Sequence, residues 1–260
     1  MATFAPGAGP LSAEQRERRF FLIMAAVMAA TIVAGFSLNL AMGRSRFASP
    51  LLYHVHGVIF MGWIGLYLAQ AYTIATGRRA LHIQLGKAAY LWVPLMVAAG
   101  IAIMIYVARR NGGPFFFDLN EFLVSNVMLL LCFGGLALWA LRRQRHTGWH
   151  RRLMLVSMTV LTGPGLGRLM PGPLLIPYAW EIVITATLIF PAIAMIADRR
   201  RRGKVHPAYW WGTGIYVGTF VVSMLLAYSP LGYAITEAAV AGTPGGERPM
   251  VAYLPPGFAM

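Results

Sequence analysis

Long apolar stretches, separated by short basic turns, recur along almost the whole chain. A helix needs about 20 apolar residues to cross the hydrocarbon layer of a bilayer. Seven stretches come near this length: 20–42, 51–75, 88–107, 122–141, 153–170, 174–197 and 208–228. Of all residues 58% are apolar and only 12% are charged, which is not the balance of a soluble domain. The sequence therefore predicts an all-α, polytopic membrane protein with about seven transmembrane helices, and it offers no soluble domain that would bind nucleic acid.

The basic residues indicate how the chain is oriented in the membrane. The net charge is +14, and most of the 22 lysines and arginines lie on one side of the predicted spans. They precede the first span and fill the turns near Arg78, Arg142 and Arg199. Because positively charged loops stay in the cytoplasm, we expect an inner (plasma) membrane protein with a cytoplasmic N-terminus and an external C-terminus. The four arginines at 199–202 should contact anionic lipids of the cytoplasmic leaflet.

The two ends of the chain differ from the spans in composition. We assign residues 1–19 to a cytoplasmic tail and the start of the first helix, 20–228 to the seven-span domain, and 229–260 to an external Gly/Pro-rich tail. Ser12 with Gln15 three residues later is a capping box, which predicts that the first helix begins near Leu11. In the C-terminal tail we expect a short interfacial helix followed by extended chain.

Two predicted helical hairpins resemble each other. The second and third spans carry His54 and His82, and the fourth and fifth carry Glu121 and His150 at nearly the same spacing. Two such hairpins, related by an axis along the membrane normal, predict a four-helix core from the second to the fifth span. A partner membrane subunit or a homo-oligomer remains open.

The histidines of these hairpins fall at two depths. His54 and His56 lie near the outer face, and His82 and His150 lie near the inner face. A helix rises about 1.5 Å per residue, so one ion cannot take ligands from both groups. The outer pair suggests ligands of a single metal ion or a haem, and the inner pair suggests the two axial ligands of a haem b.

His56 is the preferred residue of the outer pair. Residues two apart on a helix point in nearly opposite directions, so His54 and His56 do not both face the bundle. His56, Trp63 and Gln70 are spaced seven apart and share one stripe of the helix. Polar side chains on such a stripe must face protein rather than lipid.

Other polar side chains share the outer depth, and three interpretations of them remain. In the first, Arg168 pairs with Glu181 and the histidines only hold helices together. In the second, His54 or His56 binds a metal ion or haem with help from Glu121. In the third, a cavity without a cofactor accepts a solute or a proton. Its lining would be Trp63, Gln70, Glu121, Asn126, Arg168 and Glu181.

The motifs of the two hairpins also carry a resemblance. They form the signature HxHG…W…Q…LHxxLG, made by His54, His56, Gly57, Trp63, Gln70, Leu81, His82, Leu85 and Gly86. With His150-x-Arg152-Leu153-Met154, this signature resembles a widespread group of bacterial multipass membrane proteins to which no activity is assigned. The likeness covers residues 36–170. In looser outline the chain is similar to four-helix transmembrane cytochromes of the b561 type, which hold haem b between paired histidines and pass electrons across the bilayer.

The looser resemblance implies a redox function, but the outer depth departs from it. Glu121, Ser125 and Asn126 stand where a second histidine would be needed to face His54 or His56. Because of the resemblance, our first interpretation is still a membrane redox or cofactor-binding protein. The alternative is a non-catalytic helical subunit of a membrane complex or a small-solute transporter. The sequence leaves open whether the protein is an enzyme.

Overall fold

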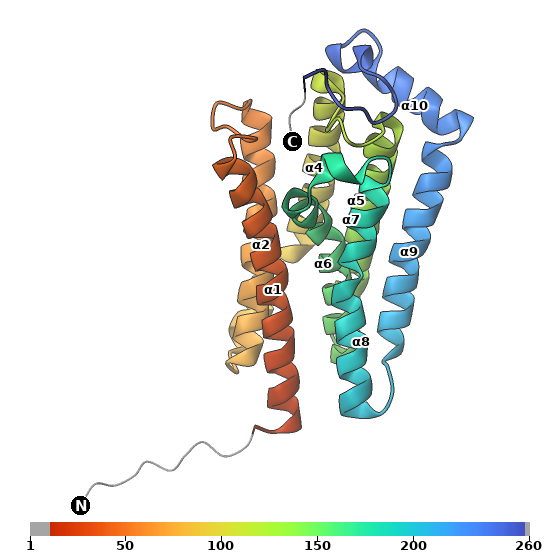
Figure 1. The fold of residues 1–260 in the computed structure, drawn as a ribbon. Coiled ribbons are helices and arrows are strands. Elements are labelled where there is room, and N and C mark those ends of the chain that lie inside the picture. The colour runs from red at the N-terminus through yellow and green to blue at the C-terminus, as the bar shows by residue number, and fades with distance from the viewer. Residues whose placement is uncertain (1–10, 258–260) are drawn as a thin grey trace, which may run out of the picture.

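The computed structural model describes residues 11–257, and in these residues helices are the only regular elements (Figure 1). The all-α class is therefore confirmed. The elements are α1 Ala13–Ala41, α2 Leu51–Ala75, α3 Arg79–Gly86, α4 Ala89–Asn111, α5 Leu119–Arg142, α6 Thr147–Leu169, η1 Gly172–Leu175, α7 Ala179–Thr187, α8 Ile189–Arg202, α9 Pro207–Ala227, α10 Pro230–Val240 and η2 Pro244–Glu247.

Six segments of the described chain are long and apolar enough to cross a membrane, which confirms a polytopic protein. They are α1, α2, α4, α5, the α7–α8 pair and α9. The predicted fifth span corresponds to α6, which has 23 residues but is more polar. It packs against α1, α5, α7 and α9. Since these neighbours shield α6 from lipid, it can carry buried polar side chains at Arg152, Ser157, Thr159 and Thr162.

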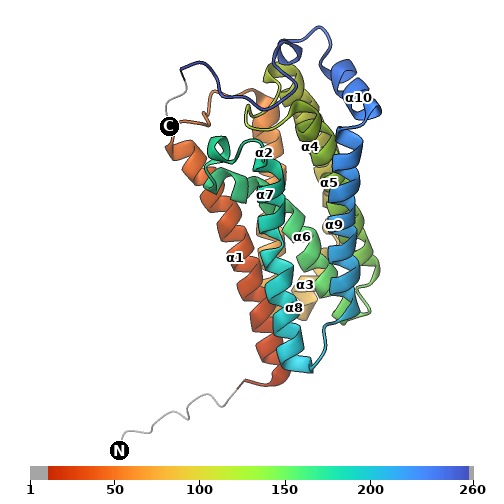
Figure 2. The same cartoon turned by 45° about the vertical axis from the view of Figure 1, so that its right-hand side comes forward.

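The four helices predicted to form the core are neighbours in sequence order. α2 packs on α4, α4 on α5, and α5 on α6. α1 packs against both α2 and α6, and α9 packs against both α5 and α6, as Figures 1 and 2 show. The main apolar cluster includes Met28 of α1, Phe133 of α5, Met158 of α6 and Tyr216 of α9. α1 and α9 therefore join the four predicted helices in one core.

Glycines bring α1 and α6 into backbone contact. A Cβ atom on Gly35 would lie 2.1 Å from the carbonyl oxygen of Gly165, and one on Gly165 would lie 2.7 Å from the Cα of Ile32. Both distances are too short for any side chain. Small residues allow such close approach between membrane helices, so the Gly-rich end of α6 serves its packing on α1.

The predicted sixth span is divided into two helices. α7 ends at Thr187 and α8 begins at Ile189. Pro191 has no N–H, so the helical hydrogen bond to the carbonyl of Thr187 cannot form. The proline thus accounts for a break one turn before it.

Both described ends of the chain have local structure. The capping box is confirmed, because Ser12 Oγ accepts from the Gln15 N–H at 3.1 Å and Gln15 Oε1 accepts from the Ser12 N–H at 2.8 Å. The rest of the assigned N-terminal tail, residues 1–10, lies outside the described residues. After α9 the chain forms α10 and η2, and α10 packs on α4, α5 and α9.

The segment after η2 is anchored by one guanidinium group. Arg248 donates to the carbonyl oxygens of Gly112, Pro114 and Phe117 at 2.6, 3.1 and 2.8 Å. This part of the chain therefore covers the end of the bundle opposite to the start of α1 (Figure 1).

Candidate functional site

The side chain of His54 forms hydrogen bonds with the loop that precedes α2. Its Nε2–H donates to the carbonyl oxygens of Phe47 and Ser49 at 3.0 and 3.1 Å, and its side chain is exposed. In the described residues no three His, Cys, Asp or Glu side chains converge to hold a metal ion. The single-ion site predicted from His54, His56 and Glu121 is therefore not assembled, because His54 turns to its own loop and Glu121 lies with other carboxylates.

His56 faces the bundle, as the stripe predicted. Its ring stacks on Phe60 with centroids 4.1 Å apart, and it interacts electrostatically with Arg168 of α6. Its Nδ1 is buried and finds no hydrogen-bond partner in the described chain. Trp63 Nε1 and both polar atoms of Gln70 are buried and unpaired in the same way. The polar stripe of α2 is thus inside the protein and retains unused hydrogen-bonding capacity along its length.

Arg168 does not pair with Glu181. Its Nη1 donates to the carbonyl of Pro164 at 2.8 Å, and its guanidinium carbon lies 4.1 Å from the centroid of the Phe36 ring. Among the ion pairs of residues 11–257, none includes either side chain. The first interpretation of the outer residues was wrong in this respect, because equal depth does not place two side chains on facing sides of their helices.

Carboxylates lie near the starts of α5 and α7. Glu121 is only 2% exposed, and it interacts electrostatically with Glu181 and Asp118. Asp118 accepts from the Tyr228 hydroxyl at 2.9 Å and from the Ala252 N–H at 2.6 Å. Burial and the neighbouring Glu121 raise the pKa of Tyr228, which keeps its hydroxyl a hydrogen-bond donor. Glu121 and Glu181 each keep one buried oxygen that has no partner in the described residues.

Asn126 takes no part in this group. Its amide nitrogen donates to the carbonyl of Phe122 on its own helix at 2.6 Å. The predicted polar lining therefore lacks one member.

The inner histidines come together. The ring centroids of His82 on α3 and His150 on α6 are 6.3 Å apart, and the ring planes are nearly perpendicular at 89°. His82 Nδ1–H donates to the Gln70 carbonyl at 3.2 Å, and His150 Nδ1–H donates to the Ala140 carbonyl at 2.8 Å. A neutral imidazole that donates from Nδ1 keeps a lone pair on Nε2. Both rings are therefore oriented by backbone groups and have a free ligating nitrogen.

The spacing of this pair fits a shared metal centre. His82 and His150 would be the residues that hold a metal ion or a haem here, since their ring centroids lie 6.3 Å apart. Backbone carbonyls bonded to Nδ1 are the usual partners that orient ligating histidines. Burial lowers the pKa of His82 below its ordinary value of 6.5, which favours the neutral form that binds a metal.

A buried charge cluster lies at the same end of the bundle as His82 and His150. It was not predicted from the sequence. Arg152 of α6 is 0% exposed, and its Nη2 donates to Glu17 of α1 at 3.0 Å and also to Asp198 of α8. Arg202 also pairs with Glu17, at 2.7 Å, and Arg151 lies 3.0 Å from it. We call Glu17, Arg151, Arg152, Asp198 and Arg202 the charge cluster. The sequence did contain a pattern that could have predicted this cluster, because Glu17 and Asp198 are carboxylates within membrane-length helices and need a partner there.

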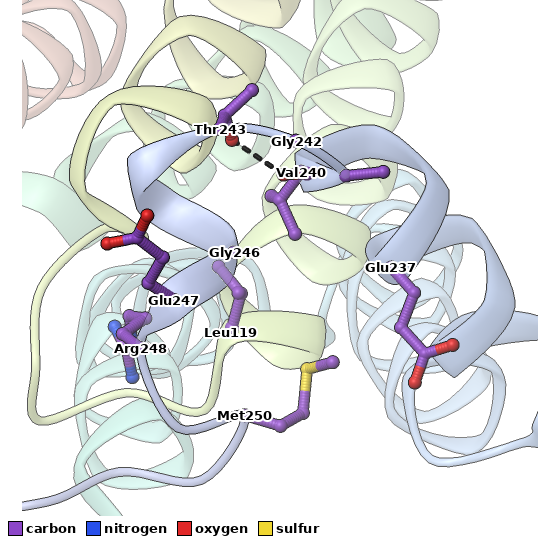
Figure 3. A pocket seen from close by; sticks show the side chains of 10 residues that line it. Leu119, Glu237, Val240, Gly242, Thr243, Gly246, Glu247, Arg248 and Met250 are labelled. Carbon is purple, nitrogen blue, oxygen red and sulfur yellow. Dashed lines mark hydrogen bonds between the residues drawn. The ribbon is translucent and has the colours of Figure 1, made fainter.

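The end of the bundle that carries α10 has an open pocket of about 430 Å³ (Figure 3). It is lined by Leu119, by α10 and by the segment around η2, including Glu237, Glu247 and Arg248. Thr243 closes one side by donating to the Val240 carbonyl at 2.6 Å. None of the predicted site residues lines this pocket, so it is separate from the histidine sites.

No protein-family model matches this chain, and no curated protein or solved structure matches it either.

Proposed function

We propose that this protein is a membrane redox component that holds haem b between His82 and His150. The observation that carries the proposal is the neighbouring pair of imidazoles, with ring centroids 6.3 Å apart and both Nδ1 atoms bonded to backbone carbonyls. When bound, haem b supplies one-electron redox chemistry. The looser likeness to cytochromes of the b561 type supports the same ligand type.

The residues around the pair suit such a group. Gly86 lies one turn after His82, and a Cβ atom there would touch the Gln70 amide at 3.4 Å, so its small size leaves room beside the ring. The Gln70 amide is itself buried and unpaired in the described residues, and it can donate to a bound group. Arginines and Lys87 in the flanking turns can pair with anionic propionates. The proposal takes one haem, because no histidine faces His56.

The test is the visible spectrum of the purified protein. A haem b protein gives a Soret band that shifts on reduction, and titration with hemin should saturate at one equivalent. We expect His82→Ala and His150→Ala each to abolish the bis-histidine spectrum. His54→Ala and His146→Ala are matched controls, because they remove exposed histidines and should leave the spectrum unchanged.

Two results would contradict the proposal. If the wild-type protein elutes as a single folded species yet takes up no hemin, it does not bind haem b. If both His82→Ala and His150→Ala keep the wild-type spectrum, these two histidines are not the haem ligands. Elution volume and thermal unfolding of each variant distinguish a lost ligand from a lost fold.

A second candidate function rests on a different observation. Buried polar atoms without partners in the described chain occur at His56, Trp63, Gln70, Glu121, Arg168 and Glu181. Such atoms favour a route for a proton or a small polar solute without a cofactor. Proton uptake by liposomes containing the protein tests this function, and Glu121→Gln should slow it. No proton flux above that of empty liposomes would exclude a proton route, and a helical subunit without transport would remain.

We also infer an inner-membrane location with the start of α1 in the cytoplasm. The basic turns after α2, α5 and α8 lie at the end of the bundle where α1 begins (Figure 1), and such turns stay inside. Reporter fusions after residue 145 and after residue 257 test this orientation. The first should report the cytoplasm and the second the outside.

A further inference from the structure

A shallow groove of about 450 Å³ runs along α8. Its lining consists of Ile193, Ile196 and Ala197, followed by Arg200 and Arg201. Successive turns contribute Ile193, then Ile196 and Ala197, then Arg200 and Arg201, so these residues form one stripe of the helix. The side chains of Ile193 and Ile196 are 43% and 53% exposed, on a segment that is apolar enough to cross the membrane. The stripe therefore presents an apolar wall that ends in two guanidinium groups.

The two guanidinium groups have no carboxylate partner in the described residues. Glu17 and Asp198 are paired instead with the three arginines of the charge cluster. Arg201 is fixed in place, since its guanidinium carbon lies 4.1 Å from the centroid of the Phe20 ring and its Nε donates to the Ala197 carbonyl at 3.1 Å. Its terminal nitrogens keep donors for an anion. The positive charge here is left uncompensated by the protein.

The depth of the stripe matches one leaflet. From Ile193 to Arg201 the helix rises about 12 Å, which is close to half of the ~30 Å hydrocarbon layer. An acyl chain lying on the isoleucines would thus bring a phosphate to the level of the arginines. Arginine binds phosphate oxygens with several N–H donors at once.

We infer that this groove of α8 binds one anionic phospholipid of the cytoplasmic leaflet. Its phosphate is held by Arg200 and Arg201, and one acyl chain lies along Ile193 and Ile196. The site is independent of the haem proposal, because it shares no residue with the histidine pair. It turns the general expectation of lipid contact at the basic turn into a defined site.

Native mass spectrometry of delipidated protein measures this binding directly. The protein is incubated with phosphatidylglycerol or with phosphatidylcholine, and the fraction carrying one lipid is followed against lipid concentration. For the wild type we expect one phosphatidylglycerol adduct, with at least tenfold weaker binding of phosphatidylcholine. Arg200→Gln should weaken the phosphatidylglycerol adduct about tenfold, which is about 1.4 kcal/mol.

Two further variants separate a groove from a general effect of charge. Ile196→Trp fills the apolar wall and keeps every charge, so it should also weaken the adduct. Arg199→Gln removes a charge from the same turn without lining the groove, so it should leave the adduct within twofold of wild type. All variants are compared after elution at the wild-type volume.

The inference fails if Arg199→Gln and Arg200→Gln weaken binding equally, since general attraction of anionic lipid by the positive charge of the turn would then explain the binding. It also fails if Ile196→Trp binds phosphatidylglycerol like the wild type, or if both lipids bind equally well.

Discussion

Replacing Arg152 by methionine should destabilise the protein more than any other single loss of an arginine at the end of the bundle where α1 begins. Arg152 is fully buried and pairs with both Glu17 and Asp198. Removing one partner of a buried ion pair costs about 3–5 kcal/mol, because the remaining charge stays in a medium of low dielectric constant. Here the remaining carboxylates keep other donors. Arg202 still binds Glu17 at 2.7 Å, and the His206 N–H still binds Asp198 at 2.9 Å.

We therefore expect the lower end of that range, about 3 kcal/mol, for Arg152→Met. For a chain of this size the loss corresponds to a decrease in Tm of roughly 6–12 °C. Thermal unfolding of the detergent-solubilised protein measures the decrease. Arg145→Met is the matched control, because it removes an arginine from an exposed turn, and its Tm should stay within about 1–2 °C of wild type.

The double variant Arg152→Met, Asp198→Leu tests the physical reason. If the cost comes from a carboxylate left without its partner, replacing that carboxylate by an apolar group should restore part of the lost Tm. A single variant as stable as Arg145→Met would refute the assignment of Arg152 as the centre of the cluster. A double variant less stable than the single one would show that packing, and not charge, accounts for the loss.

Three further predictions follow from local contacts. Gly165→Val should lower the free energy of unfolding by about 1–3 kcal/mol or more, because its Cβ meets the backbone of α1 at 2.7 Å; Gly135→Val, at a position with nothing within 4 Å, should cost less in the same denaturation assay. Burial, and then the arginines of the charge cluster, lower the pKa of His206 below 6.5. The unfolded chain then binds more protons than the folded chain, so the stabilisation is complete above pH 6.5 and is lost as the pH falls toward the lowered pKa. The His206 Nδ1 caps α9 by accepting from the Ala208 N–H at 3.1 Å, and asparagine offers a similar acceptor. His206→Asn should therefore flatten this part of a Tm–pH curve, and an unchanged slope would contradict the assignment. Arg248→Ala removes the donors to three carbonyls, and hydrogen exchange should become faster at residues 112–119 while the rest of the bundle exchanges as in wild type.

The spans and the capping box were predictable because they depend on neighbours in the sequence. An apolar run of membrane length needs no distant partner to become a helix, and Ser12 caps a residue three positions away. The inward turn of His56 was also predictable, since it follows from the stripe that it shares with Trp63 and Gln70. The match between His82 and His150 followed from the similarity of two hairpins, although the sequence did not give their distance.

The partners of the buried charges depend on how helices are rotated about their axes. Arg152 meets Glu17 and Asp198 from 135 and 46 positions away along the chain. Similar depth in the membrane suggested that Arg168 pairs with Glu181, yet the Arg168 side chain packs on Phe36 instead. Hydropathy likewise places a helix in the membrane, but it does not reveal which helix is surrounded by the others.

The central place of α6 has a consequence for biogenesis. This helix is less apolar than the six membrane-length segments, and it brings a guanidinium group into the bundle, so it enters the bilayer poorly by itself. When the ribosome has released α6, the carboxylate of Glu17 on α1 is already in the membrane, whereas that of Asp198 has yet to be synthesised. Insertion of α6 should therefore be helped by contact with α1, and replacing Glu17 should lower the fraction of chains in which α6 enters the bilayer.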